Sequence, residues 1–267
     1  MFDIFDTHAH YDDEAFDEDR EELLAGLPSK GVRFAVNVGA SLEGARKSAA
    51  YAASYDYIYS AAGLHPDDIG QLNEESFEEI RSMAKEEKCV AIGEIGLDYH
   101  WMVRPREEQK AGFIRFLELA KELDKPINVH SRDSHQDCFD IIKAHHAGTS
   151  GGIIHCFSGS AELAKEYVKL GYYIGIGGVA TFKNAKTLPE VIRLIPLERI
   201  VTETDCPYLA PVPFRGKRND SSKISYVIEA IAQIRGTDPE ETARILFENA
   251  MRVYRLKLSF AETGNKA

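Results

Sequence analysis

The stretch Ile4-Phe5-Asp6-Thr7-His8-Ala9-His10 is a short apolar run that ends in two histidines. Four further runs of this kind follow along the chain, and each leads into a histidine or a carboxylate. Apolar runs of this length are typical of buried β-strands. We therefore expect five strands to carry side chains of metal-ligand type to their C-terminal ends. The four further stretches are Val90-Ala91-Ile92-Gly93-Glu94, Ile127-Asn128-Val129-His130, Ile153-Ile154-His155 and Ile200-Val201-Thr202-Glu203-Thr204-Asp205.

The chain alternates throughout between strand-like and helix-like periods. The clearest helical pattern covers 106–124, where apolar residues recur at helical spacing and Glu and Lys fill the other face. Eight strands with helices between them are typical of a closed parallel barrel, so we predict the α/β class and a (β/α)8 TIM barrel. The expected strands are 4–10, 33–40, 57–65, 89–97, 126–131, 151–157, 172–178 and 199–205. The other expected helices are 41–54, 74–87, 134–146, 160–169, 186–194 and 221–235.

An additional C-terminal helix is expected after the barrel. The stretch Thr237-Asp238-Pro239-Glu240-Glu241 offers an N-cap, a proline in the first turn and acidic residues that complement the helix dipole. An apolar stripe then runs from Ala243 to Tyr254. A chain of 267 residues fits one barrel domain. We predict a single domain over 1–257, followed by a polar tail over 258–267.

Composition limits the partners and the compartment. The formal net charge is −11, so a polyanionic substrate would have to be held by a local cationic patch or by metal. Four scattered cysteines without a CxxC pair indicate free thiols in a reducing compartment. The N-terminal segment has no basic region and no long apolar run, and no stretch approaches a membrane span. We expect a cytoplasmic protein with no membrane association and no obligate protein partner.

Six residues form the candidate metal site: His8, His10, Glu94, His130, His155 and Asp205. In a (β/α)8 barrel the chemistry lies at the C-terminal ends of the strands, and residues two apart share a face, as His8 and His10 do. Each residue taken alone is also explained by a strand that ends in a polar side chain. Burying several imidazoles and carboxylates together without metal is costly, however, so their coincidence at one rim favours metal.

Two divalent metals would explain the ligand set. Glu94 comes from a middle strand and is placed to bridge two cations, and Asp205 is placed to bind one of them and to orient a water. Two cations about 3.5–4 Å apart lower the pKa of water and clamp the attacking and leaving oxygens. Imidazole favours Zn, Mn, Fe or Ni, whereas carboxylate and phosphate accept Mg or Mn, so ligand type leaves the metal open.

Several longer motifs resemble those of the TatD-related deoxyribonuclease family, within the amidohydrolase-like metal-dependent barrels. The resemblance runs from Phe5 to the end of the last helix. It is carried by Gly63-Leu64-His65-Pro66, Gly93-Glu94-Ile95-Gly96-Leu97-Asp98-Tyr99, His130-Ser131-Arg132-Asp133, His155-Cys156-Phe157-Ser158-Gly159, Glu203-Thr204-Asp205-Cys206-Pro207-Tyr208-Leu209-Ala210-Pro211 and the basic stretch Arg215-Gly216-Lys217-Arg218-Asn219.

The resemblance implies a cytoplasmic nuclease, stimulated by Mg or Mn, that hydrolyses phosphodiester bonds of DNA with a metal-activated water. It further implies 3′-to-5′ exonuclease action on single strands. One metal would be held by His8, His10, Glu94 and Asp205, and the second by Glu94, His130 and His155. Asp205 would be the general base, so that Asp205 and Glu94 are the catalytic residues.

Two positions depart from the family pattern. Phe214 stands where the family often has a histidine, and Asp220-Ser221 stands where Glu-Pro is common. Both lie in the expected substrate loop, so they bear on substrate preference and leave the metal ligands unchanged.

Four residues are candidate substrate contacts: His65, Arg132, Arg215 and Lys217. Arg132 follows a ligand strand and is placed to clamp a phosphate oxygen, although pairing with Asp133 would also explain it. Arg215 and Lys217 follow the eighth strand, where barrel enzymes place phosphate contacts, although a solvated loop fits equally. One ring of Tyr99-His100-Trp101 could stack on a base or only pack over the rim.

Two other functions compete with a nuclease. A metal-dependent amide or ester hydrolase, for example an aminoacyl-tRNA deacylase, would use the same barrel, but many such barrels carry a bridging lysine on the fourth strand, where this chain has Glu94. A binding or scaffold protein would predict a broken ligand set, and all six ligands are present. We rank the nuclease first, the other hydrolase second and the binding protein third.

Overall fold

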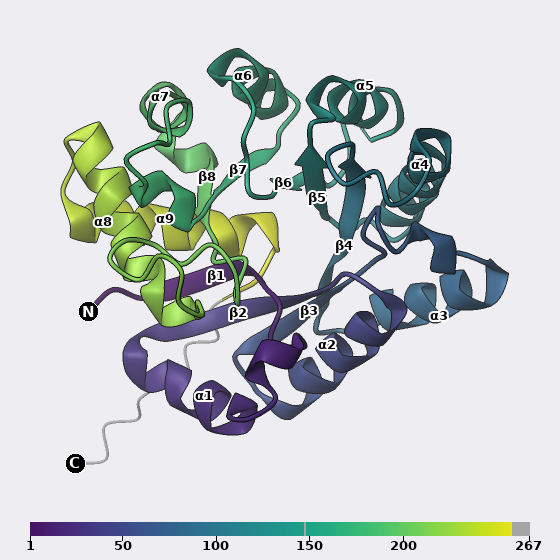
Figure 1. Cartoon of the computed structure of the whole chain (residues 1–267), viewed down its shortest axis with the longest axis horizontal. Helices are drawn as coiled ribbons and strands as arrows, with labels where there is room; N and C mark the ends of the chain where they lie inside the picture. Colours follow the sequence, from purple (N-terminus) through teal and green to yellow (C-terminus); the bar gives the residue numbers. More distant parts are fainter. Residues whose placement is uncertain (147, 258–267) are drawn as a thin grey trace.

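A computed structural model describes residues 1–146 and 148–257, and it shows the predicted barrel (Figure 1). Eight strands form one sheet in which every neighbouring pair is parallel and the strands follow sequence order. The (β/α)8 prediction is therefore confirmed. The strands are β1 Ile4–Ala9, β2 Val32–Gly39, β3 Ile58–Ala62, β4 Cys89–Asp98, β5 Ile127–Arg132, β6 Gly152–Ile154, β7 Tyr173–Ile176 and β8 Ile200–Thr202.

The first strand and the segment after the last strand meet where the sheet closes on itself. Ala9 and Cys206 form a parallel bridge. The Asp205 amide donates to the His8 carbonyl at 2.9 Å, and the His10 amide donates to the Cys206 carbonyl at the same distance. The closure therefore brings the two histidines of β1 beside Asp205.

Helices surround the sheet (Figure 1). The apolar stripe expected on the fourth helix is buried, including Phe113, Phe116 and Leu117. The helices are α1 Arg20–Gly26, α2 Leu42–Ser54, α3 Glu74–Ala84, α4 Arg106–Glu122, α5 His135–His145, α6 Ala161–Lys169, α7 Leu188–Leu194, α8 Ile224–Arg235 and α9 Pro239–Val253. Short 3-10 helices are η1 Glu14–Phe16, η2 Leu27–Lys30, η3 Ile69–Gln71, η4 Gly178–Thr181, η5 Leu197–Arg199 and η6 Ser221–Lys223.

The additional C-terminal helix is present as α9. The Asp238 side chain accepts from the Glu241 amide at 3.0 Å, as an N-cap does, and Pro239 begins the helix. The helix packs against β8 and β1, and the Tyr254 hydroxyl that follows it donates to the Thr7 carbonyl at 2.8 Å. The predicted polar tail over 258–267 lies outside the described residues.

The structure differs from the expected elements in two respects. The third, sixth and eighth strands end at Ala62, Ile154 and Thr202, so the apolar runs continue past the hydrogen-bonded ladder into the loops. The sequence reading also missed α1, whose seven residues bury only Leu24 and carry too few apolar positions for a clear period. Among the described residues, no helix is both long and apolar enough to cross a membrane.

Candidate metal centre

The six predicted ligands meet at the C-terminal end of the barrel. His8, Glu94 and His130 lie within β1, β4 and β5, whereas His10, His155 and Asp205 lie in the loops that follow β1, β6 and β8. All except the fully buried His8 border a cavity of about 790 Å³, which is large enough for part of a polymeric substrate.

The first group of ligand atoms surrounds one oxygen of Glu94. His8 Nε2 and His10 Nε2 each lie 3.6 Å from Glu94 Oε2 and only 2.9 Å from each other. Asp205 Oδ1 completes this side, at 3.4 Å from His10 Nε2 and 3.9 Å from His8 Nε2. These atoms point into one small space, so a single cation would contact all of them.

The second group surrounds the other oxygen of Glu94. His130 Nδ1 lies 3.0 Å and His155 Nε2 lies 3.7 Å from Glu94 Oε1. The two oxygens of one carboxylate therefore face two separate sets of imidazole nitrogens. This arrangement suits a carboxylate that bridges two metals.

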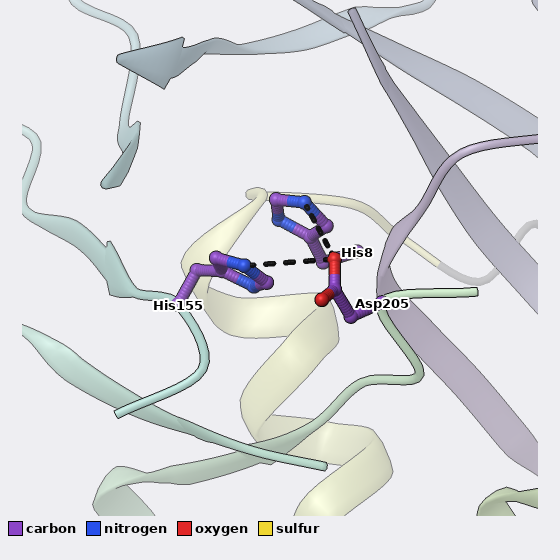
Figure 2. A group of neighbouring side chains, drawn as sticks. All are labelled: His8, His155 and Asp205. Atoms are coloured by element: carbon purple, nitrogen blue, oxygen red, sulfur yellow. Dashed lines mark ion pairs between the residues drawn. The ribbon is translucent and has the colours of Figure 1, made fainter. Parts of the chain in front are cut away.

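Asp205 connects the two groups. In Figure 2 the dashed lines from His8 and His155 both end on one Asp205 oxygen, Oδ1, at 3.9 Å and 3.7 Å. The His8 and His155 rings are stacked, with their centroids 3.5 Å apart. About a fifth of the Asp205 side chain is exposed, compared with 5% of the Glu94 side chain. Asp205 can therefore reach both a ligand position and a molecule in the cavity.

In three of the four imidazoles, the nitrogen that faces away from this space is held by an oxygen acceptor. His8 Nδ1 donates to Asn128 Oδ1 at 3.0 Å, and His10 Nδ1 donates to the Val38 carbonyl at 2.9 Å. His130 Nε2 donates to Asp98 Oδ2 at 3.1 Å. A proton fixed on the outer nitrogen leaves the inner nitrogen with its lone pair for a metal, so these partners select the ligating tautomer.

His155 is held in a different way. Its Nδ1 lies 3.2 Å from Glu203 Oε2, but the geometry is not that of a hydrogen bond, and both buried atoms lack a hydrogen-bond partner among the described residues. Glu203 Oε1 accepts from the Cys156 amide instead. The contact is an ion pair. Burial would lower the pKa of His155, but the nearby carboxylates, Glu203 foremost, outweigh burial and raise this pKa.

The two central carboxylates are ionised. Burial alone would raise the pKa of Glu94, but the imidazoles of His65 and His8 and the hydrogen bond from His130 hold it well below its usual range. Burial likewise opposes ionisation of Asp205, and the contact with His10 Nε2 at 3.4 Å and the charge on His155 lower its pKa. The centre therefore presents negative oxygens and nitrogen ligands together.

The donor set fits divalent metals. The groups His8–His10–Glu94, Glu94–His130–His155 and His8–His155–Asp205 each place their ligand atoms within 4.8 Å of one another. Without a cation, His8 Nε2 and His10 Nε2 face each other at 2.9 Å and can only share a proton. Mixed imidazole and carboxylate ligation suits Zn, Mn, Fe or Ni, and the carboxylates also accept Mg.

The predicted substrate contacts divide into two pairs. His65 and Arg132 border the cavity, and His65 Nε2 lies 3.9 Å from Glu94 Oε1. Arg215 and Lys217 are exposed and are not part of the cavity lining. The Arg215 guanidinium lies 4.4 Å from the centroid of the Phe182 ring. Contact of all four residues with substrate stays a prediction.

Sequence reasoning missed Asp98 and Asn128 as partners of the ligands. Asp98 is buried and ends β4, four residues after Glu94, and Asn128 lies two residues before His130 on β5. Even spacing on a strand places such pairs on one face, and this signal was present in the sequence. Asp98, His65 and His130 also form a further cluster of ligand-type atoms.

Comparison with known proteins agrees with this geometry. The sequence profile of the family described as TatD related DNase matches residues 5–255. An uncharacterized metal-dependent hydrolase of Bacillus subtilis, YabD, is 45% identical over 253 residues, which cover 95% of this chain and 99% of that protein. The protein named 3′-5′ ssDNA/RNA exonuclease TatD of Cronobacter sakazakii is 34% identical over 257 residues, which cover 94% of this chain and 97% of that protein.

Solved structures show the same architecture. The crystal structure of YjjV, a TatD homologue of Escherichia coli, superposes with a TM-score of 0.89 at 31% identity and covers 95% of this chain and 98% of that one. The TatD family hydrolase of Entamoeba histolytica superposes with a TM-score of 0.86 at 24% identity, with 95% and 98% covered. With its barrel, its convergent His, Glu and Asp side chains and these relatives, the chain belongs to the TatD-related DNase family of metal-dependent hydrolases.

Proposed function

We propose that this chain is a divalent-metal-dependent deoxyribonuclease that shortens single-stranded DNA from the 3′ end. The observation that carries the proposal is the pair of ligand groups on the two oxygens of Glu94, which open into a cavity bordered by Arg132. Relatives named as 3′-5′ ssDNA/RNA exonucleases support the substrate class. The net charge of −11 makes a local positive site necessary for any nucleic acid.

Two metal ions are proposed for the centre, with Mg or Mn as the working metal. His8, His10, Glu94 and Asp205 would hold one, and Glu94, His130 and His155 would hold the other. When bound, such ions lower the pKa of water and offset the negative charge that develops on a phosphate.

The side chains of the chain have separate tasks in this proposal. Asp205 is ionised and partly exposed, so it can accept a proton from the attacking water. Arg132 borders the cavity and can donate to non-bridging phosphate oxygens. Burial lowers the pKa of His65 to about 4, so His65 is neutral at pH 7 and can offer one N–H to the substrate without adding charge. Arg215 and Lys217 would contact the strand further from the bond that breaks.

The proposed compartment is the cytoplasm. All four cysteines are free, and Cys89, Cys138 and Cys206 are buried. Free thiols are the usual state in a reducing compartment.

The proposal predicts metal-dependent shortening of an end-labelled single strand by the purified protein. With Mg or Mn, products should become shorter from the 3′ end only. A chelator should abolish the reaction, and Asp205→Asn should lower the rate by about 100-fold or more because the proton acceptor is lost. Gel separation of the labelled products measures both the rate and the polarity.

The control for Asp205→Asn is Asp140→Asn, which makes the same chemical change on the exposed face of α5. It should leave the rate unchanged. A protein that binds metal stoichiometrically but cleaves no strand with any divalent ion would contradict the nuclease proposal, and assays on amide and ester substrates would follow. A normal rate for Asp205→Asn would contradict the role of Asp205 alone.

A further inference from the structure

Trp101 is an exposed aromatic residue at the mouth of the metal centre. It is the single tryptophan of the chain, it lies in the loop between β4 and α4, and 62% of its surface is exposed. It also borders the cavity that contains the metal ligands. Exposure alone would need no explanation, but this ring borders the cavity of the metal centre, where an aromatic face is available to a bound molecule.

The two residues before Trp101 are occupied by other contacts. The Tyr99 hydroxyl donates to Asp137 Oδ2 at 2.7 Å, and the Arg106 guanidinium lies 4.2 Å from the centre of the Tyr99 ring. His100 Nδ1 lies 3.0 Å from Asp133 Oδ2. Of the three rings in this stretch, only that of Trp101 borders the cavity.

The position of Trp101 is tied to the metal ligands through Asp98. Asp98 Oδ1 accepts from the backbone amides of His100 and Trp101 at 2.8 Å and 2.9 Å. Asp98 Oδ2 accepts from His130 Nε2. One buried carboxylate therefore sets the start of the loop and the orientation of a ligand, so the backbone of Trp101 is fixed relative to the centre.

A cation lies over the indole ring, which leaves the opposite face for a base. The Arg132 guanidinium is 5.4 Å from the centre of the Trp101 ring, within the range of a cation–π contact, and it also borders the cavity. An aromatic face next to a guanidinium at a metal centre matches the two halves of a nucleotide. The base stacks on the ring, and the phosphate is drawn toward Arg132 and the ligands.

We propose that Trp101, with Arg132 beside it, forms a nucleobase subsite that takes an unpaired base next to the phosphate at the metal centre. The subsite rests on the proposed nuclease function, because it needs the phosphate of a strand at the ligands. A base within a duplex is stacked between its neighbours and paired, so it cannot lie against the indole. The subsite therefore selects single strands and accepts any base, because every base has a flat face.

Fluorescence of this tryptophan tests the subsite without turnover. The probes are a short oligothymidylate and the same strand with abasic residues, added to the full-length Asp205→Asn protein in Mg. The oligothymidylate should quench the emission, and the abasic strand should not. Loss of one stacked base should weaken binding by about 5- to 150-fold.

Variants of the loop measure the same effect by anisotropy of fluorescein-labelled strands. In the Asp205→Asn background, Trp101→Ala should weaken binding of oligothymidylate by that factor and leave binding of the abasic strand unchanged, and Trp101→Phe should restore part of the loss. Val103→Ala is the matched control, because Val103 is 58% exposed in the same loop and is not part of the cavity lining. It should bind both strands as the parent does.

The outcomes separate the subsite from the nuclease. Cleavage of strands by the wild-type protein, with no quenching and equal binding of the two probes, overturns the subsite and leaves the nuclease. Quenching and base-dependent binding without any cleavage by the wild-type protein support the subsite and contradict the nuclease. Failure of the protein to bind either strand, together with no cleavage by the wild-type protein, overturns both.

Discussion

His130 shows how single side chains prepare this centre for metal. Its ring lies between two carboxylates, with Nδ1 3.0 Å from Glu94 Oε1 and Nε2 3.1 Å from Asp98 Oδ2. Burial would lower its pKa, but the hydrogen bonds to Asp98 and Glu94 raise it to about 9. In metal-free protein the Nδ1 proton therefore occupies the direction that a metal would take, and the Asp98 contact keeps the other proton in place.

Asp98→Asn should weaken metal binding by about 10- to 100-fold. The single amide oxygen of Asn cannot accept from both His130 and the backbone amides of His100 and Trp101. If the amide group faces His130, Nε2 becomes an acceptor and Nδ1 keeps its proton, so the inner lone pair is lost. Calorimetric titration of metal-free protein with Zn or Mn measures the affinity.

The control for Asp98 is Asp133→Asn, which changes an exposed carboxylate that lies 3.0 Å from His100 Nδ1. The backbone at Asp133 has a positive φ of 53°, which Asn also accepts. Equal metal affinities for Asp98→Asn and Asp133→Asn would contradict the role given to Asp98.

Among the secondary-structure elements, α9 supports the barrel from the end opposite the cavity. Ala250, Met251, Val253 and Tyr254 join one apolar cluster with side chains of the strands, such as Phe5. The Asn249 amide is fully buried and donates to the carbonyls of Leu197 and Ile200 at 2.8 Å and 2.7 Å. These bonds attach the helix to the start of β8, which leads to Asp205.

Asn249→Ala should lower the free energy of unfolding by about 1–3 kcal/mol, because two buried carbonyls lose their donor. Urea unfolding followed by circular dichroism measures this change. Arg244→Ala, on the exposed face of the same helix, removes only exposed ion pairs to Glu241 and Glu248 and should leave the urea midpoint nearly unchanged. Equal midpoints for the two variants would show that α9 does not depend on Asn249.

For the whole molecule, metal and fold are coupled. The candidate ligands come from or follow β1, β4, β5, β6 and β8, so bound cations would connect five of the eight strands. An ion that binds only the folded protein stabilises it, by about 2.7 kcal/mol at a hundred times its dissociation constant.

This stabilisation should increase from pH 6 to pH 8. Burial would lower the pKa of His10, but the close contact with Asp205 and the charge of Glu94 raise it to about 10. The pKa of His130 is about 9. Both imidazoles hold protons across this range in metal-free protein, and metal must displace them. Each displaced proton makes affinity rise about tenfold per pH unit.

The measurement is the rise in melting temperature caused by a constant excess of Zn or Mn over a chelated sample, at pH 6 and at pH 8. His145→Ala, which removes a histidine away from the centre on α5, should show the same pH dependence as the wild type. A rise that does not change with pH would contradict proton displacement at the ligands.

Much of the architecture, and the meeting of the six candidate ligands at one rim, could be predicted because both depend on local patterns. The alternation of apolar runs and amphipathic segments predicts the strands and helices, and His8 and His10 share a face because residues alternate along a strand. The short β6 and β8 were predicted too long, because apolar runs such as Ile153-Ile154 continue into loops that are also buried.

The sequence alone therefore determines which six residues are of ligand type and that they lie at strand ends. The alternation of side chains along a strand and the parallel order of the strands are enough to gather them at one rim. The tertiary structure settles which nitrogen of each imidazole faces inward, that Asp98 joins His130 to the loop of Trp101, and that Arg215 lies away from the cavity. These contacts join different strands and loops, and their geometry depends on sheet register and on closure of β1 against the segment after β8, which no local pattern contains.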